Sequence, residues 1–141
     1  MWYSIETLLR LAGLAQICLV IGSLAIPKVL KWDAALAGVD ILIRQMFWTY
    51  AGYILVINLC FGLISVFGYK VLTNGSELAV WVTCFISVYW ISRLIIQFFY
   101  FDRSQFPIGF WYKLGEYVLV SLFLCLSLVY SWATYINYIN I

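Results

Sequence analysis

Arg93 places a permanent positive charge inside the apolar run that extends from about Leu78 to Phe101. Helical geometry puts it roughly 13 Å from Asp102, just beyond the end of that run. A guanidinium presents five N–H donors and no acceptor, and a central arginine costs about 2.5–3.5 kcal/mol on the membrane-insertion scale. The charge therefore needs a polar partner or a route to the membrane surface.

The nearest predicted neighbours of Arg93 lie on its own helix. Tyr89, Arg93 and Gln97 recur at four-residue spacing, so they fall on one helical stripe, which Tyr100 extends. Further polar groups are expected on the same membrane side, at the ends of neighbouring helices. They are Asp40, Arg44, Gln45, Asp102 and Glu116. We expect all these side chains to converge with Arg93 in the cytoplasmic half of a helical bundle.

This predicted convergence has two interpretations. One is a polar pocket for an anionic headgroup or a quinone, or a proton path, because ionisable residues inside membranes often serve a function. The other is a structural network, in which basic and acidic groups neutralise one another and hold the helices together. Both interpretations, and the pairing of Arg93 with Glu116, stay open at this point.

The sequence lacks the residues that several kinds of chemistry require. Histidine is absent, which removes the commonest metal ligand and the base of a serine-hydrolase triad. The cysteines lie in separate apolar runs and form no C-x-x-C pair, so buried thiols are favoured over a redox pair. They are Cys18, Cys60, Cys84 and Cys125. No phosphate-binding glycine loop and no basic run is present. We predict no catalytic residues, no metal and no nucleic-acid partner.

The composition indicates which kind of protein holds these residues. Of the 141 residues, 66% are hydrophobic and 10% are charged, whereas a soluble domain carries roughly 25% charged residues. The mean hydropathy is +1.02. Each helical span needs about 20 apolar residues, and the runs are unbroken rather than alternating in polarity, as barrel strands would be. The sequence therefore predicts an all-α, integral membrane four-helix bundle with short loops and up-down-up-down topology, forming a single domain over 1–141.

Four helices are predicted, at about residues 8–30, 41–67, 78–101 and 110–135. Asp40 is expected to cap the second helix by accepting hydrogen bonds from its first turn, and Asn74-Gly75 indicates a turn. Small and weakly polar residues inside the runs predict close helix contacts. They are Gln16, Ser23, Ala51, Asn58, Gly62, Ser65, Ser127 and Thr134.

Basic residues predict the orientation in the membrane. Most of those that flank the runs fall on one side: Lys28, Lys31, Arg44, Arg103 and Lys113. The other side carries Arg10 and Lys70. The positive-inside rule therefore places the first group in the cytoplasm and both termini on the non-cytoplasmic side of the cell (inner) membrane.

Two strings carry a resemblance to a known group of proteins. Residues 44–48 read R-Q-x-F-W, and residues 93–102 read R-L-x-x-Q-F-F-x-x-D. With these strings the chain resembles a group of small bacterial four-span membrane proteins, over most of its length from the second helix onward. The resemblance implies a four-span fold and a bacterial origin, and it implies no activity. Residues 8–28 faintly resemble DoxX-type membrane proteins, but the missing thiol pair argues against an oxidoreductase role.

Two functions are consistent with these features. The first is a non-catalytic subunit or accessory protein of a larger membrane complex, because little of the chain lies outside the predicted spans. The alternative is a protein that binds or carries a small molecule, a lipid or a quinone, using Arg93, Gln97, Arg44 and Glu116 as its polar site. The expected partners are membrane lipid and other membrane proteins, including further copies of the chain. No cofactor is predicted beyond a bound lipid or quinone.

Overall fold

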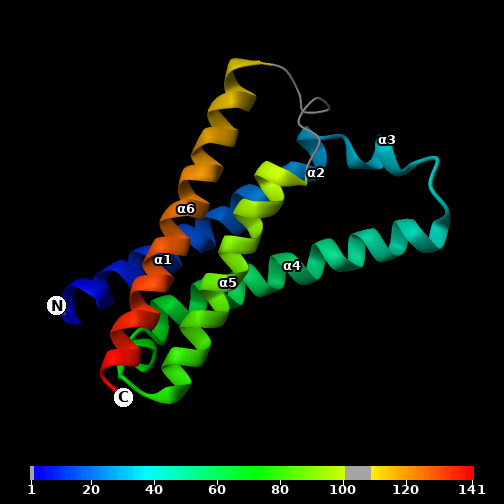
Figure 1. Ribbon diagram of the computed structural model, residues 1–141. Coiled ribbons are helices and arrows are strands. Elements are labelled where there is room, and N and C mark those ends of the chain that lie inside the picture. Colours follow the sequence, from blue (N-terminus) through cyan, green and yellow to red (C-terminus); the bar gives the residue numbers. More distant parts are fainter. Residues whose placement is uncertain (1, 101–108) are drawn as a thin grey trace.

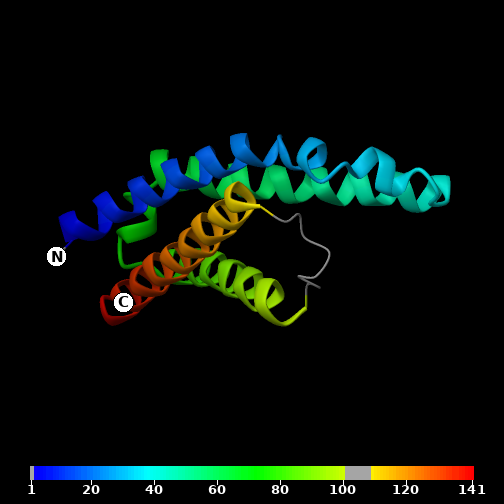
Figure 2. The same cartoon turned by 90° about the horizontal axis from the view of Figure 1, so that it is seen from above.

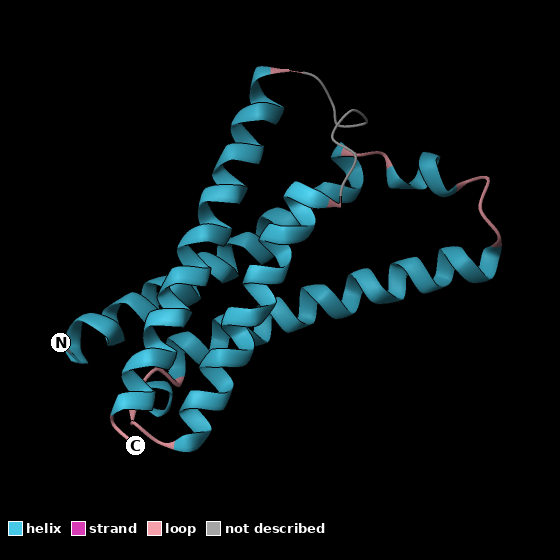
Figure 3. Cartoon of the chain, viewed as in Figure 1, coloured by secondary structure: helices cyan, strands magenta, loops and turns pink. Residues whose placement is uncertain are grey.

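The computed structural model describes residues 2–100 and 109–141, and helices make up most of them (Figures 1 and 3). The four long helices are α1 (Trp2–Ser23), α4 (Ile41–Phe67), α5 (Glu77–Phe99) and α6 (Phe110–Ile139). Three short ones lie between them: α2 (Ile26–Val29), α3 (Trp32–Leu36) and η1 (Val71–Thr73). The described residues contain no strand, so the predicted all-α fold is confirmed.

Four helical segments are long and apolar enough to cross a membrane. They are Ser4–Val29, which combines most of α1 with α2, Ile41–Phe67, Glu77–Phe99 and Phe110–Ile139. The protein is therefore a membrane protein with four candidate spans among its described residues. The direction of the chain across the membrane stays a prediction.

The first span differs from its predicted bounds. Its helix begins at Trp2 rather than near Leu8, and it is interrupted after Ser23 rather than running unbroken to Leu30. Pro27 lies in the first turn of α2, where its missing N–H removes no helical hydrogen bond. The proline thus starts a new short helix instead of ending the long one.

The two inner helices begin in different ways. The bounds of α4 match the predicted 41–67, but the Asp40 side chain accepts no hydrogen bond from the first turn, so the predicted cap is wrong. At the start of α5, by contrast, Ser76 Oγ accepts a hydrogen bond from the Ala79 N–H at 3.1 Å. The predicted end of this helix at Phe101 lies outside the described residues.

The C-terminal helix runs to Ile139, past its predicted end near Tyr135. Its last turns hold the connection between α4 and α5. Asn137 Nδ2 donates to the Leu72 carbonyl at 2.6 Å, and Asn137 Oδ1 accepts from the Gly75 N–H at 3.1 Å. Gly75 has a φ of +72°, a left-handed conformation that glycine adopts at no steric cost, as the predicted turn requires.

The long helices form two antiparallel hairpins (Figures 1 and 2). Helix α1 packs along α4, and α5 packs along α6. Figure 2 shows the first hairpin as one layer above the second. The contact between the hairpins is made mainly by α1 and α6, whereas α4 and α5 are not among the main packing pairs although they are neighbours in the sequence.

The hairpins pack together at one end only. The outermost buried residues of the four helices are Val20, Asn58, Trp90 and Phe123. We call the side that holds both termini and residues 68–76 the packed end (Figure 1). Beyond these boundary residues, the described parts of 21–57 and 91–122 contain no buried residue. We call this side the open end.

Helices α1 and α4 approach each other closely at two glycines of the packed end. A Cβ on Gly13 would lie 2.7 Å from the Gly62 carbonyl oxygen and 2.9 Å from Ser65 Cβ. A Cβ on Gly62 would lie 2.9 Å from Ile17 Cγ1. The hairpin therefore depends on the absence of side chains at this crossing, as close contacts between membrane helices commonly do.

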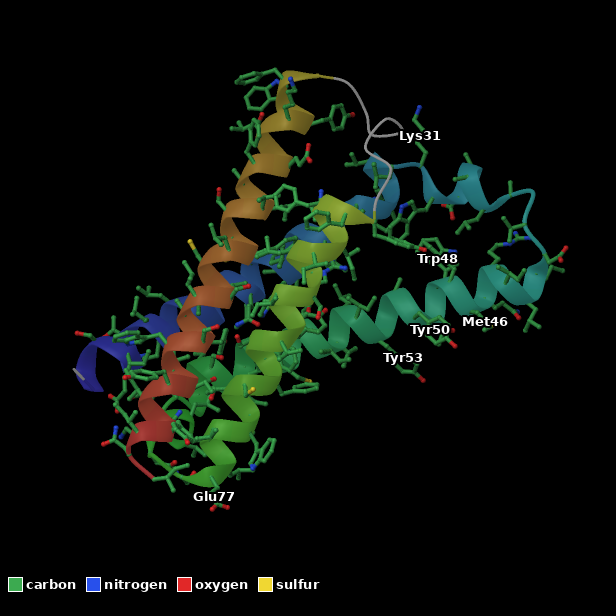
Figure 4. All side chains as sticks on the ribbon, in the orientation of Figure 1. Lys31, Met46, Trp48, Tyr50, Tyr53 and Glu77 are labelled. Atoms are coloured by element: carbon green, nitrogen blue, oxygen red, sulfur yellow. The ribbon has the colours of Figure 1, made fainter. Side chains whose placement is uncertain are left out.

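Aromatic side chains attach the short helix α3 to α4 at the open end. The Trp32 ring lies 4.9 Å from Phe47 and 5.6 Å from Trp48 between centroids, both edge to face. Figure 4 shows Tyr50 and Tyr53 on another side of α4, pointing away from the rest of the molecule. This part of α4 is thus covered by α3 on one side, whereas Tyr50 and Tyr53 lie on an exposed side.

The cysteines do not lie in the core. Cys18, Cys60 and Cys125 are exposed and Cys84 is half-buried, all as free thiols. The expectation of buried thiols is wrong for Cys18, Cys60 and Cys125, which fall on exposed helix faces, and Cys84 is only partly covered.

Candidate functional site

A buried hydrogen-bond network joins all four long helices at the packed end. Gln16 of α1 is completely buried, and its Nε2 donates to the Tyr130 hydroxyl of α6 at 2.5 Å. Trp90 Nε1 of α5 donates to Gln16 Oε1 at 3.3 Å. Ser65 of α4 shares a hydrogen bond with the same Tyr130 hydroxyl. We call these four residues the hub.

The donor directions in the hub are determined by its chemistry. The Trp90 indole can only donate, so the amide oxygen of Gln16 must face it. The amide nitrogen of Gln16 then faces Tyr130, whose oxygen accepts and whose O–H remains available to donate to Ser65. The hydrogen-bonding groups named here therefore all have partners. A polar network that is satisfied in this way fixes the positions of the helices relative to one another.

Two side-chain pairs continue this polar packing between α5 and α6. Thr134 Oγ1 donates to Thr83 Oγ1 at 3.0 Å, and the Ser87 and Ser131 hydroxyls lie 2.7 Å apart. Together with the hub, they confirm the predicted contact role of Gln16, Ser65 and Thr134. Ala51 is half-buried in the part of α4 that has no fully buried residue, so its contact role stays a prediction.

A second polar group lies at the boundary between the packed and open ends, and it is not satisfied. Asn58 of α4 is only 5% exposed, and its Oδ1 has no hydrogen-bond partner. Tyr89 of α5 lies within reach of the Asn58 side chain, but its buried hydroxyl makes no hydrogen bond of standard geometry. Arg93, one turn further along α5, acts electrostatically on Tyr89 and has a buried, unpartnered Nε. We call Asn58, Tyr89 and Arg93 the boundary cluster.

Aromatic rings surround the boundary cluster. The Arg93 Cζ lies 5.6 Å from the centroid of the Phe123 ring, which stacks on Trp90 at 5.4 Å. On the other side, Tyr89 meets the Phe61 ring edge to face at 5.3 Å. A cation held over an aromatic face gains about 0.5–2 kcal/mol. This contact orients the guanidinium but neither neutralises its charge nor uses its N–H groups.

Three of the polar residues predicted to join Arg93 lie far from it. Asp40, Arg44 and Gln45 are at the tip of the open end, where α4 has left α5 and α6 (Figure 1). Arg44 instead turns back on its own helix start, with Nη2 donating to the Val39 carbonyl at 3.4 Å. The two hairpins move apart with increasing distance from the packed end. Residues at a similar depth in the membrane can therefore lie far apart when they belong to different hairpins.

The remaining predicted residues are placed as follows. Gln97 is half-buried on α5, one turn beyond Arg93, and Glu116 is half-buried on the open part of α6. Tyr100 is 82% exposed, so the expected stripe ends in a surface residue. Asp102 lies outside the described residues.

Sequence reasoning missed Trp90, Tyr130 and Phe123. All three were indistinguishable in the sequence from other aromatic residues of the spans, which favour the membrane interface. One signal was present: Trp90 and Tyr130 lie within their apolar runs, away from the interface, where a polar ring tip needs a partner.

Comparison of the chain with family models, with curated proteins and with solved structures gives no match. The resemblance to small bacterial four-span proteins therefore stays a prediction.

Proposed function

We propose that this protein is a non-catalytic membrane protein that binds the polar head of an amphipathic molecule at the boundary cluster. One observation carries the proposal: Asn58, Tyr89 and Arg93, from two different hairpins, each hold a buried polar atom that no described residue satisfies. An unsatisfied buried polar group costs about 1–3 kcal/mol. A ligand head that makes these hydrogen bonds recovers that free energy.

The partial exposure of Tyr89 and Arg93 supports access to this cluster from the membrane. Arg93 is half-buried rather than enclosed, and it lies about 9 Å from the end of α5, within the span. Beyond it the hairpins diverge (Figure 1). The polar head of the ligand would lie against the cluster, while its apolar part stays among the lipid chains.

Native mass spectrometry of the protein, extracted from its own membrane in mild detergent, tests this function. The wild-type protein is expected to retain one reproducible non-protein mass, and Arg93→Gln is expected to lose it. Arg44→Gln is the matched control, because Arg44 is also half-buried with an unpartnered Nε but lies away from the cluster. Equal retention by all three proteins would contradict the proposal.

A second function, as a subunit of a larger membrane complex, is favoured by the exposed face on the first half of α4. None of residues 41–57 is buried, and Tyr50 and Tyr53 are 56% and 62% exposed. A partner helix could cover this surface in place of lipid. In the same mass-spectrometry experiment, a copurifying protein at fixed stoichiometry would support this function.

A further inference from the structure

We infer that the head bound at the boundary cluster is anionic, a phosphate or carboxylate carried by a lipid. This inference rests on the proposed binding function and names the class of its ligand. It follows from the charge of Arg93 and from the chemistry of the side chains around it.

The contacts shown for the Arg93 guanidinium are with neutral side chains. Phe123 offers a ring face at 5.6 Å and Tyr89 a hydroxyl, and Asn58, which lies against Tyr89, adds an amide. A guanidinium stays protonated in proteins, so burial does not remove its charge. A charge held in hydrocarbon needs a counter-charge as well as hydrogen bonds. An anionic head supplies both.

The donors of the cluster suit an oxyanion. Arg93 Nε and the Tyr89 O–H can donate to different oxygens of one phosphate or carboxylate, and hydrogen bonds to such ionised groups are the strong ones. The carbonyl of a neutral quinone would accept a hydrogen bond from Arg93 and leave its charge uncompensated. Asn58 Oδ1 is an acceptor, so it suits a hydroxyl near the anionic group, as in a phosphoglycerol head.

The charges of the open end favour the same ligand class. Basic side chains near a membrane surface attract anionic lipids. Figure 4 shows Lys31 at the open end and Glu77 at the packed end. The described basic residues of the open end are Lys28, Lys31, Arg44, Arg93 and Lys113, against the acidic residues Asp33, Asp40 and Glu116.

Thermal unfolding of the delipidated full chain in a neutral detergent tests this inference. The protein is titrated separately with dioleoylphosphatidylglycerol, dioleoylphosphatidylcholine, a short-chain ubiquinone and inorganic phosphate. A ligand that binds only the folded state raises the melting temperature with saturation. We expect phosphatidylglycerol to do so, phosphatidylcholine and the quinone not to, and Arg93→Gln to weaken the apparent affinity about tenfold or more.

Two further variants keep the result interpretable. Arg10→Gln is the matched control, because Arg10 also lies over an aromatic ring, 5.0 Å from the Tyr69 centroid, but at the packed end. It is expected to bind phosphatidylglycerol as the wild type does. Arg93→Lys keeps the charge and is expected to retain the preference for phosphatidylglycerol with reduced affinity, even if Arg93→Gln does not fold.

The possible outcomes separate the ligand class from the binding function. Stabilisation by the quinone alone, lost in Arg93→Gln, would overturn the anionic ligand and leave binding at Arg93 intact. Equal stabilisation by both phospholipids would overturn it as well. Stabilisation by inorganic phosphate that depends on Arg93 would support an anionic ligand, but one that comes from solution and not from a lipid. If no ligand depends on Arg93, both the ligand class and the proposed function are wrong.

Discussion

The hub and the boundary cluster lie next to each other on α5, with Trp90 in one and Arg93 in the other. Both contain polar side chains from different helices, buried where a membrane would surround them. In the hub, the side chains of Gln16 and Tyr130 form hydrogen bonds with their neighbours. In the boundary cluster, the Tyr89 hydroxyl and Arg93 Nε form none. The difference indicates that a buried polar residue has a structural role when the helices themselves supply its partners.

Packing explains why the two regions differ. Gly13 and Gly62 let α1 and α4 meet closely, so Gln16 and Ser65 reach the other hairpin. Beyond Asn58 the described part of the open end has no buried residue, and α4 has no partner for its polar groups from α5 or α6. Three of the unsatisfied buried atoms, in Asn58, Tyr89 and Arg93, therefore occur where the packing between the hairpins ends, and a fourth, Arg44 Nε, lies at the tip of the open end.

The largest expected effect is at the glycine crossing of the packed end. Gly13→Ala places a Cβ 2.7 Å from a backbone oxygen of α4, so the helices must move apart. We expect a loss of about 1–3 kcal/mol in the free energy of unfolding, measured by denaturation with sodium dodecyl sulfate in mixed micelles. Gly52→Ala is the control, since no atom lies within 4 Å of its added Cβ. Equal effects would mean that this close contact does not hold the hairpin.

A smaller effect is expected in the hub. Tyr130→Phe removes the hydroxyl that Gln16 and Ser65 share, and interhelical hydrogen bonds in membranes contribute about 0.6–1.7 kcal/mol. The same denaturation assay should show a loss of this size. Tyr53→Phe, which changes an exposed hydroxyl at the open end, should leave the stability unchanged. A Tyr130→Phe protein as stable as the wild type would contradict the structural role of the hub.

The smallest loss is expected at Arg93 itself. In delipidated protein, Arg93→Met removes a cation–π contact of about 0.5–2 kcal/mol, but it also removes a charge that costs about 2.5–3.5 kcal/mol inside a membrane. The thermal stability should therefore stay the same or rise. A fall as large as that of Tyr130→Phe would show that Arg93 has a structural role, and the comparison between the two regions would fail.

The sequence predicted the four long helices and some of the residues that bring them together, among them Gln16 and Ser65, because apolar runs and small polar residues indicate both. It singled out Arg93 and Tyr89 correctly as neighbours, since spacing along one helix determines which residues share its face. It did not predict that Asp40, Arg44 and Gln45 lie apart from them. Their separation depends on the angle at which the two hairpins diverge. The pattern of residues within a single helix does not determine this angle.

Trp90, Tyr130 and Phe123 were missed for a related reason. Their roles come from contacts between helices, such as the 5.4 Å stacking of Trp90 on Phe123. Aromatic residues make up 20% of the chain, so residue type alone does not distinguish these three from the others.

Photo-crosslinking from inside and outside the site tests the central claim most directly. A benzophenone amino acid replaces Gln97, one turn from Arg93, or Tyr53, which faces outward at the open end (Figure 4). After irradiation in native membranes, position 97 is expected to give one dominant lipid adduct that is lost in Arg93→Gln, while position 53 gives a mixture that follows the bulk lipid composition. The same mixture at both positions would contradict a specific binding site at the boundary cluster.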